Sequence, residues 1–183
     1  MEKKTHYFYA LKLPSEIKKH LRDTCEGLKM NFPFKSWVHM EDYHITLAFL
    51  GHADKEQLET SIELTKKALA EKDSFVLTIN QLGTFGKSDS PRIFWAGTEM
   101  EMQLHDCRDL VFQACKQAGF QLETRAFHPH ITLARKWIGS HPYIHDIQLE
   151  IEPIAFQAEE VVLYETHLDK VPKYEVKELF LLK

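Results

Sequence analysis

The sequence is poor in the residues that mark several large classes of protein. Among its 183 residues there are three cysteines, seven glycines and seven prolines. Cys25, Cys107 and Cys115 form no Cys-x-x-Cys pair, so neither a disulfide framework nor a zinc knuckle is indicated and reduced thiols are expected. The low glycine and proline content excludes a linker-rich or collagen-like chain. No apolar run approaches the roughly 18 residues that cross a membrane, so no membrane partner is expected.

An excess of positive charge is also missing. The chain has 23 lysines and arginines against 27 acidic residues, which gives a formal net charge of −4. A protein that grips a long duplex by neutralising many phosphates is strongly basic, so that class is excluded. A small phosphorylated ligand held by a few local cations stays open. The first residues, Met-Glu-Lys-Lys-Thr-His, lack the apolar region of a signal peptide. We therefore expect a cytoplasmic protein, and we expect a monomer.

The hydrophobic pattern is that of a globular α+β protein without an internal linker, so we treat 1–183 as a single domain. Loops between neighbouring strands such as 75–79 and 92–97 are too short for a helical crossover, which favours antiparallel pairing. Ser15 and Asp54 are expected as helix N-caps, and Gly119 as a C-cap. The expected helices are 17–28, 54–70 and 102–118; the expected strands are 7–13, 37–40, 43–50, 75–79, 92–97, 130–134, 147–151, 160–164 and 174–182; residues 83–91 are expected to form a loop.

One pentapeptide occurs twice. His-Ile-Thr-Leu-Ala stands at 44–48 and again at 130–134. In a strand, side chains at i and i+2 point to the same face, so His44 shares a face with Thr46, and His130 shares one with Thr132. The apolar residues between them point the other way, toward a core. If the two strands face each other, two imidazoles and two hydroxyls meet in one site.

This set of groups suits the hydrolysis of a phosphodiester. One base must activate water and one acid must protonate the departing alkoxide, and two histidines can supply both functions near neutral pH. The threonine hydroxyls can donate hydrogen bonds to phosphate oxygens, where charge grows in the transition state. A strained cyclic phosphate is a suitable substrate because its ring strain lowers the need for a metal ion.

Two other interpretations of the repeat stay open. A lone histidine on a strand is usually a structural residue, although two identical copies argue against this. A metal site can also be drawn from His128, His130 and His44. Threonine is a poor zinc ligand, however, and no carboxylate lies inside either repeat, so we favour a site without a metal.

The two His-x-Thr repeats identify the chain as similar to the 2H phosphoesterase superfamily, and most of all to its bacterial RNA 2′,3′-cyclic phosphodiesterases, also called 2′-5′ RNA ligases. The resemblance covers nearly the whole chain. Beyond the two motifs, extended to 44–51 and 129–135, it rests on an opening strand at 8–14, a central strand at 91–97 and a C-terminal signature at 163–168. The loop 83–90 is longer and more polar than this resemblance leads us to expect.

The resemblance implies a bilobal, pseudo-two-fold 2H phosphoesterase fold, in which two mainly antiparallel sheets face a central cleft and the helices lie outside. It implies hydrolysis of RNA 2′,3′-cyclic phosphate ends to 2′-phosphates without a cofactor, and the reverse reaction would form a 2′-5′ linkage. By the same likeness, His44 would protonate the leaving 3′ oxygen and His130 would activate water. Arg135 would bind the phosphate. The two motifs are equivalent in sequence and do not themselves fix which histidine is the acid.

Further residues and functions are weaker candidates. Arg135 has the wrong strand parity for the histidine face unless the strand twists or ends there. Arg92 and Arg125 fit solvated surface better than the site, and His39, His128 and His141 could tune the histidine pair. One of four aromatic residues near the motifs could stack on a base: Phe49, Trp95, Phe127 and Trp137. The alternative functions are hydrolysis of a non-RNA cyclic phosphate, and binding of a nucleotide or RNA end without catalysis.

Overall fold

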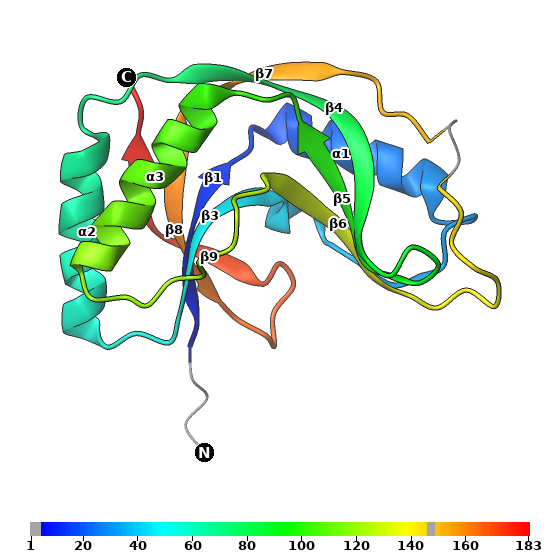
Figure 1. Ribbon diagram of the computed structural model, residues 1–183, viewed down its shortest axis with the longest axis horizontal. Coiled ribbons are helices and arrows are strands. Elements are labelled where there is room, and N and C mark those ends of the chain that lie inside the picture. The colour runs from blue at the N-terminus through cyan, green and yellow to red at the C-terminus, as the bar shows by residue number, and fades with distance from the viewer. Residues whose placement is uncertain (1–4, 146–148) are drawn as a thin grey trace.

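The structure is a computed structural model that describes residues 5–145 and 149–183 (Figure 1). Its strands form two antiparallel sheets, so the expected α+β class with antiparallel pairing is confirmed. Sheet A has the order β3-β1-β8-β9, and sheet B has the order β2-β6-β5-β4-β7. The strands are β1 (Tyr7–Lys12), β2 (Phe34–Trp37), β3 (His44–Gly51), β4 (Phe75–Gly86), β5 (Pro91–Thr98), β6 (His130–Trp137), β7 (Ile154–Ala158), β8 (Glu160–Thr166) and β9 (Tyr174–Leu181).

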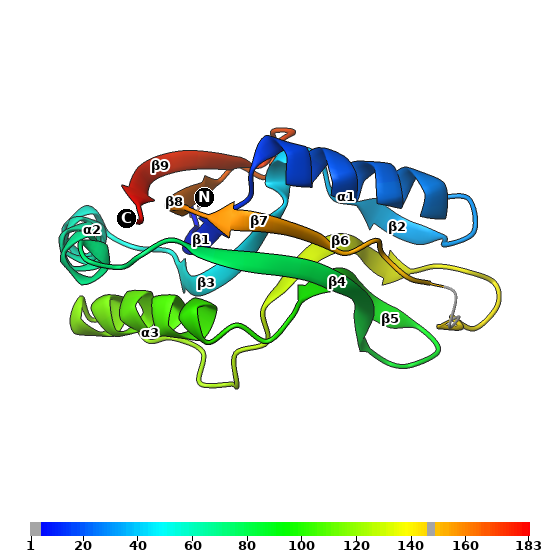
Figure 2. The same cartoon turned by 90° about the horizontal axis from the view of Figure 1, so that it is seen from above.

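The helices lie at the outside of the two sheets. Helix α1 (Ser15–Leu28) runs along one side, and α2 (Lys55–Leu69) packs beside α3 (Met102–Gln117) at the other end of the molecule (Figures 1 and 2). A 3₁₀ turn, η1 (Met40–Asp42), precedes β3. In the described part of the chain, no helix is long and apolar enough to span a membrane.

Sheet A has two unlike faces. One face joins the main hydrophobic core, to which α1, α3 and sheet B also contribute. The other face carries a small separate cluster made by Phe8, Ala10, Val162 and Tyr164, with Tyr174 packed against it. Because Lys12 and Ala10 pair with His44 and Thr46 in the β1–β3 ladder, this second cluster shares its face with the first His-x-Thr motif. The aromatic cluster therefore forms the surroundings of that motif.

Several expected boundaries differ from the structure. Helix α1 begins at Ser15 itself, after Pro14, and no side chain caps it, whereas the Asp54 carboxylate does accept from the Gln57 amide as expected. The expected strand 37–40 is displaced to β2, and 40–42 form a 3₁₀ turn. Of the expected strand 147–151, residues 147 and 148 lie outside the described residues, and 149–151 are irregular. Strand β7 was not expected.

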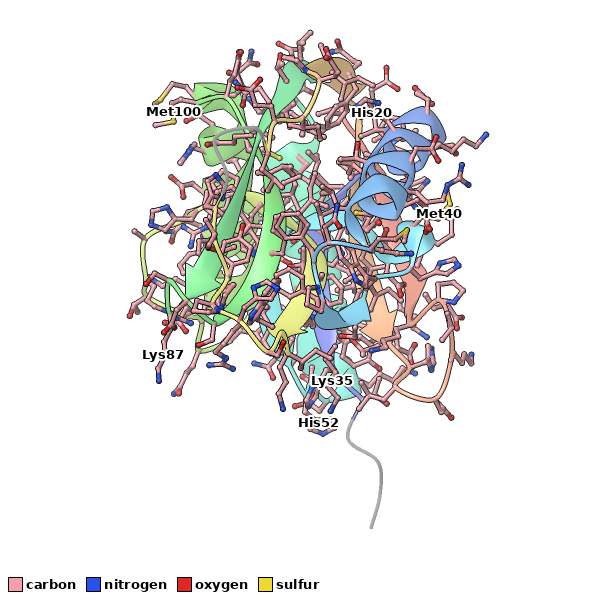
Figure 3. All side chains as sticks on the ribbon, turned by 90° about the vertical axis from the view of Figure 1, so that its right-hand side faces the viewer. His20, Lys35, Met40, His52, Lys87 and Met100 are labelled. Carbon is pink, nitrogen blue, oxygen red and sulfur yellow. The ribbon has the colours of Figure 1, made fainter. Side chains whose placement is uncertain are left out.

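The expected loop at 83–91 is the largest error. Strand β4 continues to Gly86, and only 87–90 lie between β4 and β5. Gly83 pairs with Trp95, so glycine lies inside a paired strand here. Glycine usually weakens a strand, and the polar composition favours a loop, but the ladder to β5 overrides both preferences. Figure 3 shows Lys87, in the turn, at the same end of the molecule as Lys35 of β2, opposite His20 and Met100.

Candidate active site

The two repeats lie on strands that approach each other from different sheets. The first repeat is in β3, at the edge of sheet A, and the second is in β6 of sheet B. Cα atoms of the two strands come within 8 Å of each other. The charge of His130 disfavours protonation of His44 and so helps to lower the pKa of His44. The structure thus brings the two expected motifs together.

Alternation within each repeat follows the strand period as expected. The intervening residues Ile45 and Ile131 are fully buried, each with 0% exposure. The histidine and threonine side chains are half-buried in both repeats. Each strand therefore anchors its apolar face in the core and presents its polar face to the site.

Both strands then break the alternation at the same place. In the β1–β3 ladder Tyr9 pairs with Ala48 and Ala10 with Thr46, so Leu47 is an extra residue. In the β5–β6 ladder the extra residue is Leu133, because Thr132 and Ala134 pair with consecutive residues of β5. A residue without a partner is a β-bulge, and it reverses which face later residues occupy.

The bulge moves the fifth residue after each histidine onto the site face. Arg135 lies there in the second repeat, and its charge disfavours protonation of both His44 and His130. The corresponding residue of the first repeat is Phe49, which is 55% exposed and packs at 5.9 Å against the His6 ring. A strict period of two would put Arg135 on the face opposite to His130, and the bulge is the reason that it lies on the same face.

A backbone carbonyl holds each imidazole in one tautomer. Nδ1 of His44 lies 2.7 Å from the carbonyl oxygen of Asp42, and Nδ1 of His130 lies 2.7 Å from that of His128. A carbonyl oxygen only accepts, so Nδ1 carries the proton in both rings. The reactive nitrogen is therefore Nε2 in both histidines, and a neutral ring can accept a proton there.

Aromatic rings enclose His44. Its ring centroid lies 4.8 Å from Phe8, 5.9 Å from Tyr164 and 5.2 Å from Tyr174. Its Nε2 is 3.0 Å from Oγ1 of Thr46. Burial lowers the pKa of His44 to about 4, although the hydrogen bond to the Asp42 carbonyl opposes this shift. His44 is therefore neutral at pH 7 in the free protein.

His130 is less enclosed. The Phe85 ring packs against it in a T-shaped arrangement, with a centroid distance of 4.8 Å and an interplanar angle of 89°. Burial again lowers its pKa, the hydrogen bond to the His128 carbonyl opposes the shift, and the charge of Arg135 adds to it. Both imidazoles therefore favour the neutral state before a phosphate binds.

Asp42 links the first histidine to the β8–β9 connection. It was not among the residues expected from the sequence. Its buried carboxylate accepts hydrogen bonds from the backbone amides of Lys173, at 3.0 Å, and Tyr174, at 3.1 Å. Its carbonyl orients His44. One residue thus fixes both the imidazole and a tyrosine that packs on it. An aspartate two residues before the motif histidine was the only available signal.

The other sequence candidates separate into two groups. Trp95 pairs with Thr132 and shares its face, while Trp137 is buried among core aromatic rings such as Phe34. Phe127 packs on His105 beside α3. The remaining histidine and arginine candidates are exposed to solvent, and one of them, His39, accepts a hydrogen bond from the Glu41 amide: Arg92, Arg125, His39, His128 and His141. Within 5–145 and 149–183, no group of three His, Cys, Asp or Glu side chains is arranged to hold a metal ion.

The family model described as LigT like Phosphoesterase matches residues 11–95 and 98–174. A Geobacillus stearothermophilus protein named RNA 2′,3′-cyclic phosphodiesterase is 42% identical over 175 residues, which cover 94% of this chain and 56% of that protein. This chain thus spans little more than half the length of that relative. A Bacillus subtilis protein of the same name is 35% identical over 170 residues, covering 93% of this chain and 92% of the relative.

Solved structures share the fold. The crystal structure of Escherichia coli LigT complexed with 3′-AMP matches with a TM-score of 0.79 and 23% sequence identity, over 98% of each chain. At this identity the likeness extends to the fold, and the expectation of a fold of this type is confirmed. The residues of the site are not assigned by it.

Proposed function

This chain belongs to the LigT-like phosphoesterase family, and we propose that it hydrolyses RNA 2′,3′-cyclic phosphate ends to 2′-phosphates. The observation that carries the proposal is the convergence of two identically tethered imidazoles, each with Nε2 as its reactive nitrogen, next to one arginine. The Bacillus subtilis relative, which this chain matches over nearly its full length, is named for this activity.

In the proposed reaction, Nε2 of His130 takes a proton from water as the water oxygen bonds to phosphorus. The bond from phosphorus to the 3′ oxygen breaks, and a proton on Nε2 of His44 passes to that oxygen. The 2′ oxygen keeps the phosphate. Thr46, Thr132 and Arg135 hold the non-bridging oxygens, on which charge accumulates in the transition state. With a 5′-hydroxyl in the place of water as the nucleophile, and the 3′ oxygen again leaving, the same pair of histidines would join the two ends through a 2′-5′ linkage.

The pKa values of the free protein bear on this assignment. His44, the proposed acid, has its pKa lowered to about 4, so it is neutral before substrate binds. The cyclic phosphate is an anion, and an anion next to an imidazole favours the protonated ring. Protonation of His44 is therefore coupled to phosphate binding. The proposal requires this coupling at His44, whereas the opposite assignment, with His44 as base, would require it at His130, whose pKa burial also lowers.

Product analysis tests the activity. An oligonucleotide with a 2′,3′-cyclic phosphate end is incubated with the protein in EDTA, and the product is examined by phosphorus NMR. We expect a 2′-phosphomonoester and no 3′-phosphomonoester. Tight binding without product would identify a binding protein instead, and turnover of non-RNA cyclic phosphates alone would move the substrate to another class. Loss of turnover in EDTA with recovery on added zinc would support the metal interpretation.

A second experiment tests which histidine is the acid. In a phosphodiester of nitrophenol, the nitrophenolate leaves without taking up a proton, so hydrolysis of this substrate does not need the acid. We expect His44→Ala to lose much less activity on this substrate than on the cyclic phosphate, whereas His130→Ala loses both. The opposite pattern would exchange the two roles and would leave the proposed hydrolysis intact.

A further inference from the structure

Next to the second motif, sheet B carries two aromatic rings that the proposed chemistry does not use. In the β5–β6 ladder Trp95 pairs with Thr132, and Gly97 pairs with His130. Residues paired in this way place their side chains on the same face. Trp95 therefore lies on the site face, one strand away from the threonine proposed to hold the phosphate. The glycine opposite His130 makes room for the Trp95 ring and the Gln81 side chain, which a Cβ atom there would meet at 2.7 and 2.9 Å.

The indole of Trp95 lies flat on the sheet. A Cβ atom added at Gly83 would be 2.4 Å from the ring, and one added at Gly97 would be 2.7 Å from it. Both glycines stand on the site face beside Trp95, so one face of the ring rests on their backbone. The opposite face points away from the sheet, on the side of His130 and Thr132. The side chain is only half-buried.

Phe85 extends this surface to the catalytic candidate. Its ring centroid is 5.2 Å from that of Trp95, with an interplanar angle of 39°, and the ring makes a T-shaped contact with His130. The two rings therefore form one apolar surface, which we call the Trp95–Phe85 platform. Gly83 and Gly97 lie beneath its Trp95 ring, so this part of the platform is set into the site face.

Trp95 also lacks the partner that a structural tryptophan normally has. The indole Nε1 of Trp137 donates to the His141 carbonyl at 3.0 Å, as is usual for a buried indole. The Nε1 of Trp95 is buried and makes no hydrogen bond to any described residue. Core packing alone explains neither this unpaired donor nor the two glycines under the ring.

We propose that the Trp95–Phe85 platform binds the nucleobase of the terminal nucleotide, the one whose ribose carries the cyclic phosphate. The inference rests on the proposed function and adds the part of the substrate that is recognised. One strand spacing, about 4.8 Å, separates Trp95 from Thr132, so the base on the same ribose is the one within reach. Stacking uses the π-face that every base has, and the platform therefore accepts all four bases, purines more strongly because of their larger face.

The test compares a substrate that has a base with one that does not. Adenosine 2′,3′-cyclic phosphate is set against methyl riboside 2′,3′-cyclic phosphate, in which a methoxy group replaces the base. Loss of base stacking is worth about 1–3 kcal/mol, so we expect Trp95→Leu to lower kcat/KM for the adenosine substrate by roughly tenfold or more, through KM. Turnover of the methyl riboside should be unchanged. Trp95→Phe should retain most activity on both, and Phe112→Leu, a half-buried aromatic residue on α3, is the matched control.

Two results would overturn the inference. Equal losses on both substrates would mean that Trp95 supports His130 through Phe85, and no loss on either would mean that the base lies elsewhere. A binding measurement separates this from failure of the proposed function. Adenosine 2′-monophosphate should quench the tryptophan fluorescence of the wild type, and Trp95→Phe should remove most of this quench even if neither substrate is hydrolysed. An unchanged quench in Trp95→Phe would contradict the proposal.

Discussion

The two repeats have the same backbone and different surroundings. Each places a histidine and a threonine on one face, ties Nδ1 to a carbonyl two residues earlier at 2.7 Å, and has its extra residue at the same position. Around the first repeat, aromatic rings enclose His44, and Phe49 follows at the bulge. Around the second, Arg135 follows the bulge, and among the described residues Phe85 is the one aromatic ring in contact with His130. Identical sequence thus fixes orientation, and the neighbours fix protonation.

This difference matters because acid/base catalysis of a single displacement needs two unlike groups. Two histidines in identical surroundings would share one pKa, and neither would prefer to give or to take the proton. Different burial separates their pKa values, which is how pairs of equivalent residues acquire separate functions in enzymes. The pseudo-two-fold arrangement of two lobes stays a prediction, but the local comparison can be tested at each residue.

Removal of either imidazole should have the largest effect. A positioned acid or base contributes roughly 10²–10⁴-fold to the rate, so His44→Ala and His130→Ala should each lower kcat on a cyclic phosphate by that factor. Circular dichroism should show a folded protein in both cases. His52→Ala, at an exposed histidine that follows β3, should keep wild-type activity. Full activity in either motif variant would refute the histidine pair.

Substitution of the fifth residue after each histidine, Phe49 or Arg135, should lower activity by unequal amounts. A charge-assisted hydrogen bond contributes about 1.5–3 kcal/mol, so Arg135→Ala should lower kcat/KM by roughly 10- to 100-fold. Phe49→Ala occupies the matched position on the other strand and should lower it by less than about threefold, since an exposed ring cannot pair with the phosphate. Arg135→Lys should recover part of the loss. Similar losses at both positions would remove the proposed asymmetry.

The pH dependence of stability should distinguish the two histidines. His44 has a pKa of about 4 in the folded chain and 6.5 as its ordinary value. Below pH 6.5 the unfolded chain therefore binds a proton that the folded chain does not, and the free energy of unfolding falls until about pH 4 is reached. When the pH is lowered from 7.5 to 5, the free energy of unfolding measured in urea should fall by about 2 kcal/mol more for the wild type than for His44→Gln.

His130→Gln is the comparison for this measurement. Its folded pKa is lowered as well, so the sign is the same, but the shift is smaller than that of His44. Removal of His130 should therefore flatten the pH dependence of unfolding less than removal of His44 does. An equal flattening in the two variants would mean that the aromatic enclosure does not set the pKa of His44.

The sequence predicted the parts of the molecule that depend on local periodicity. The three helices and the shared face of His44 and Thr46 follow from the 3.6 and 2.0 residue repeats, and the antiparallel pairing follows from connections too short for a helical crossover. The face of Arg135 does not, because a bulge interrupts the period of two and depends on pairing with β5. Arg135 was predicted as a phosphate-binding residue from the resemblance to a family, although the period of two placed it on the opposite face.

The remaining errors have a tertiary origin. Gly83 was read as a loop residue because glycine disfavours strands, yet it lies in β4 beneath the Trp95 ring, where a Cβ does not fit. The enclosure of His44 was not foreseen, since Phe8, Tyr164 and Tyr174 come from three strands whose order in sheet A no local pattern reveals. Asp42 was missed for the same reason, because its partners are more than 130 residues away in sequence.

The smallest effect should come from opening the aromatic enclosure by one ring. Tyr174→Leu removes a ring that packs on His44 at 5.2 Å, and water should then reach the imidazole. Because burial is the main cause of the lowered pKa, the pKa of His44 should rise by about one unit, while that of His130 stays unchanged. Phe85→Leu should act on the other histidine, so that the pKa of His130 rises and that of His44 stays unchanged. NMR titration of the ring protons reads both pKa values in one sample, and a shift common to both histidines would mean that a single shared environment sets them.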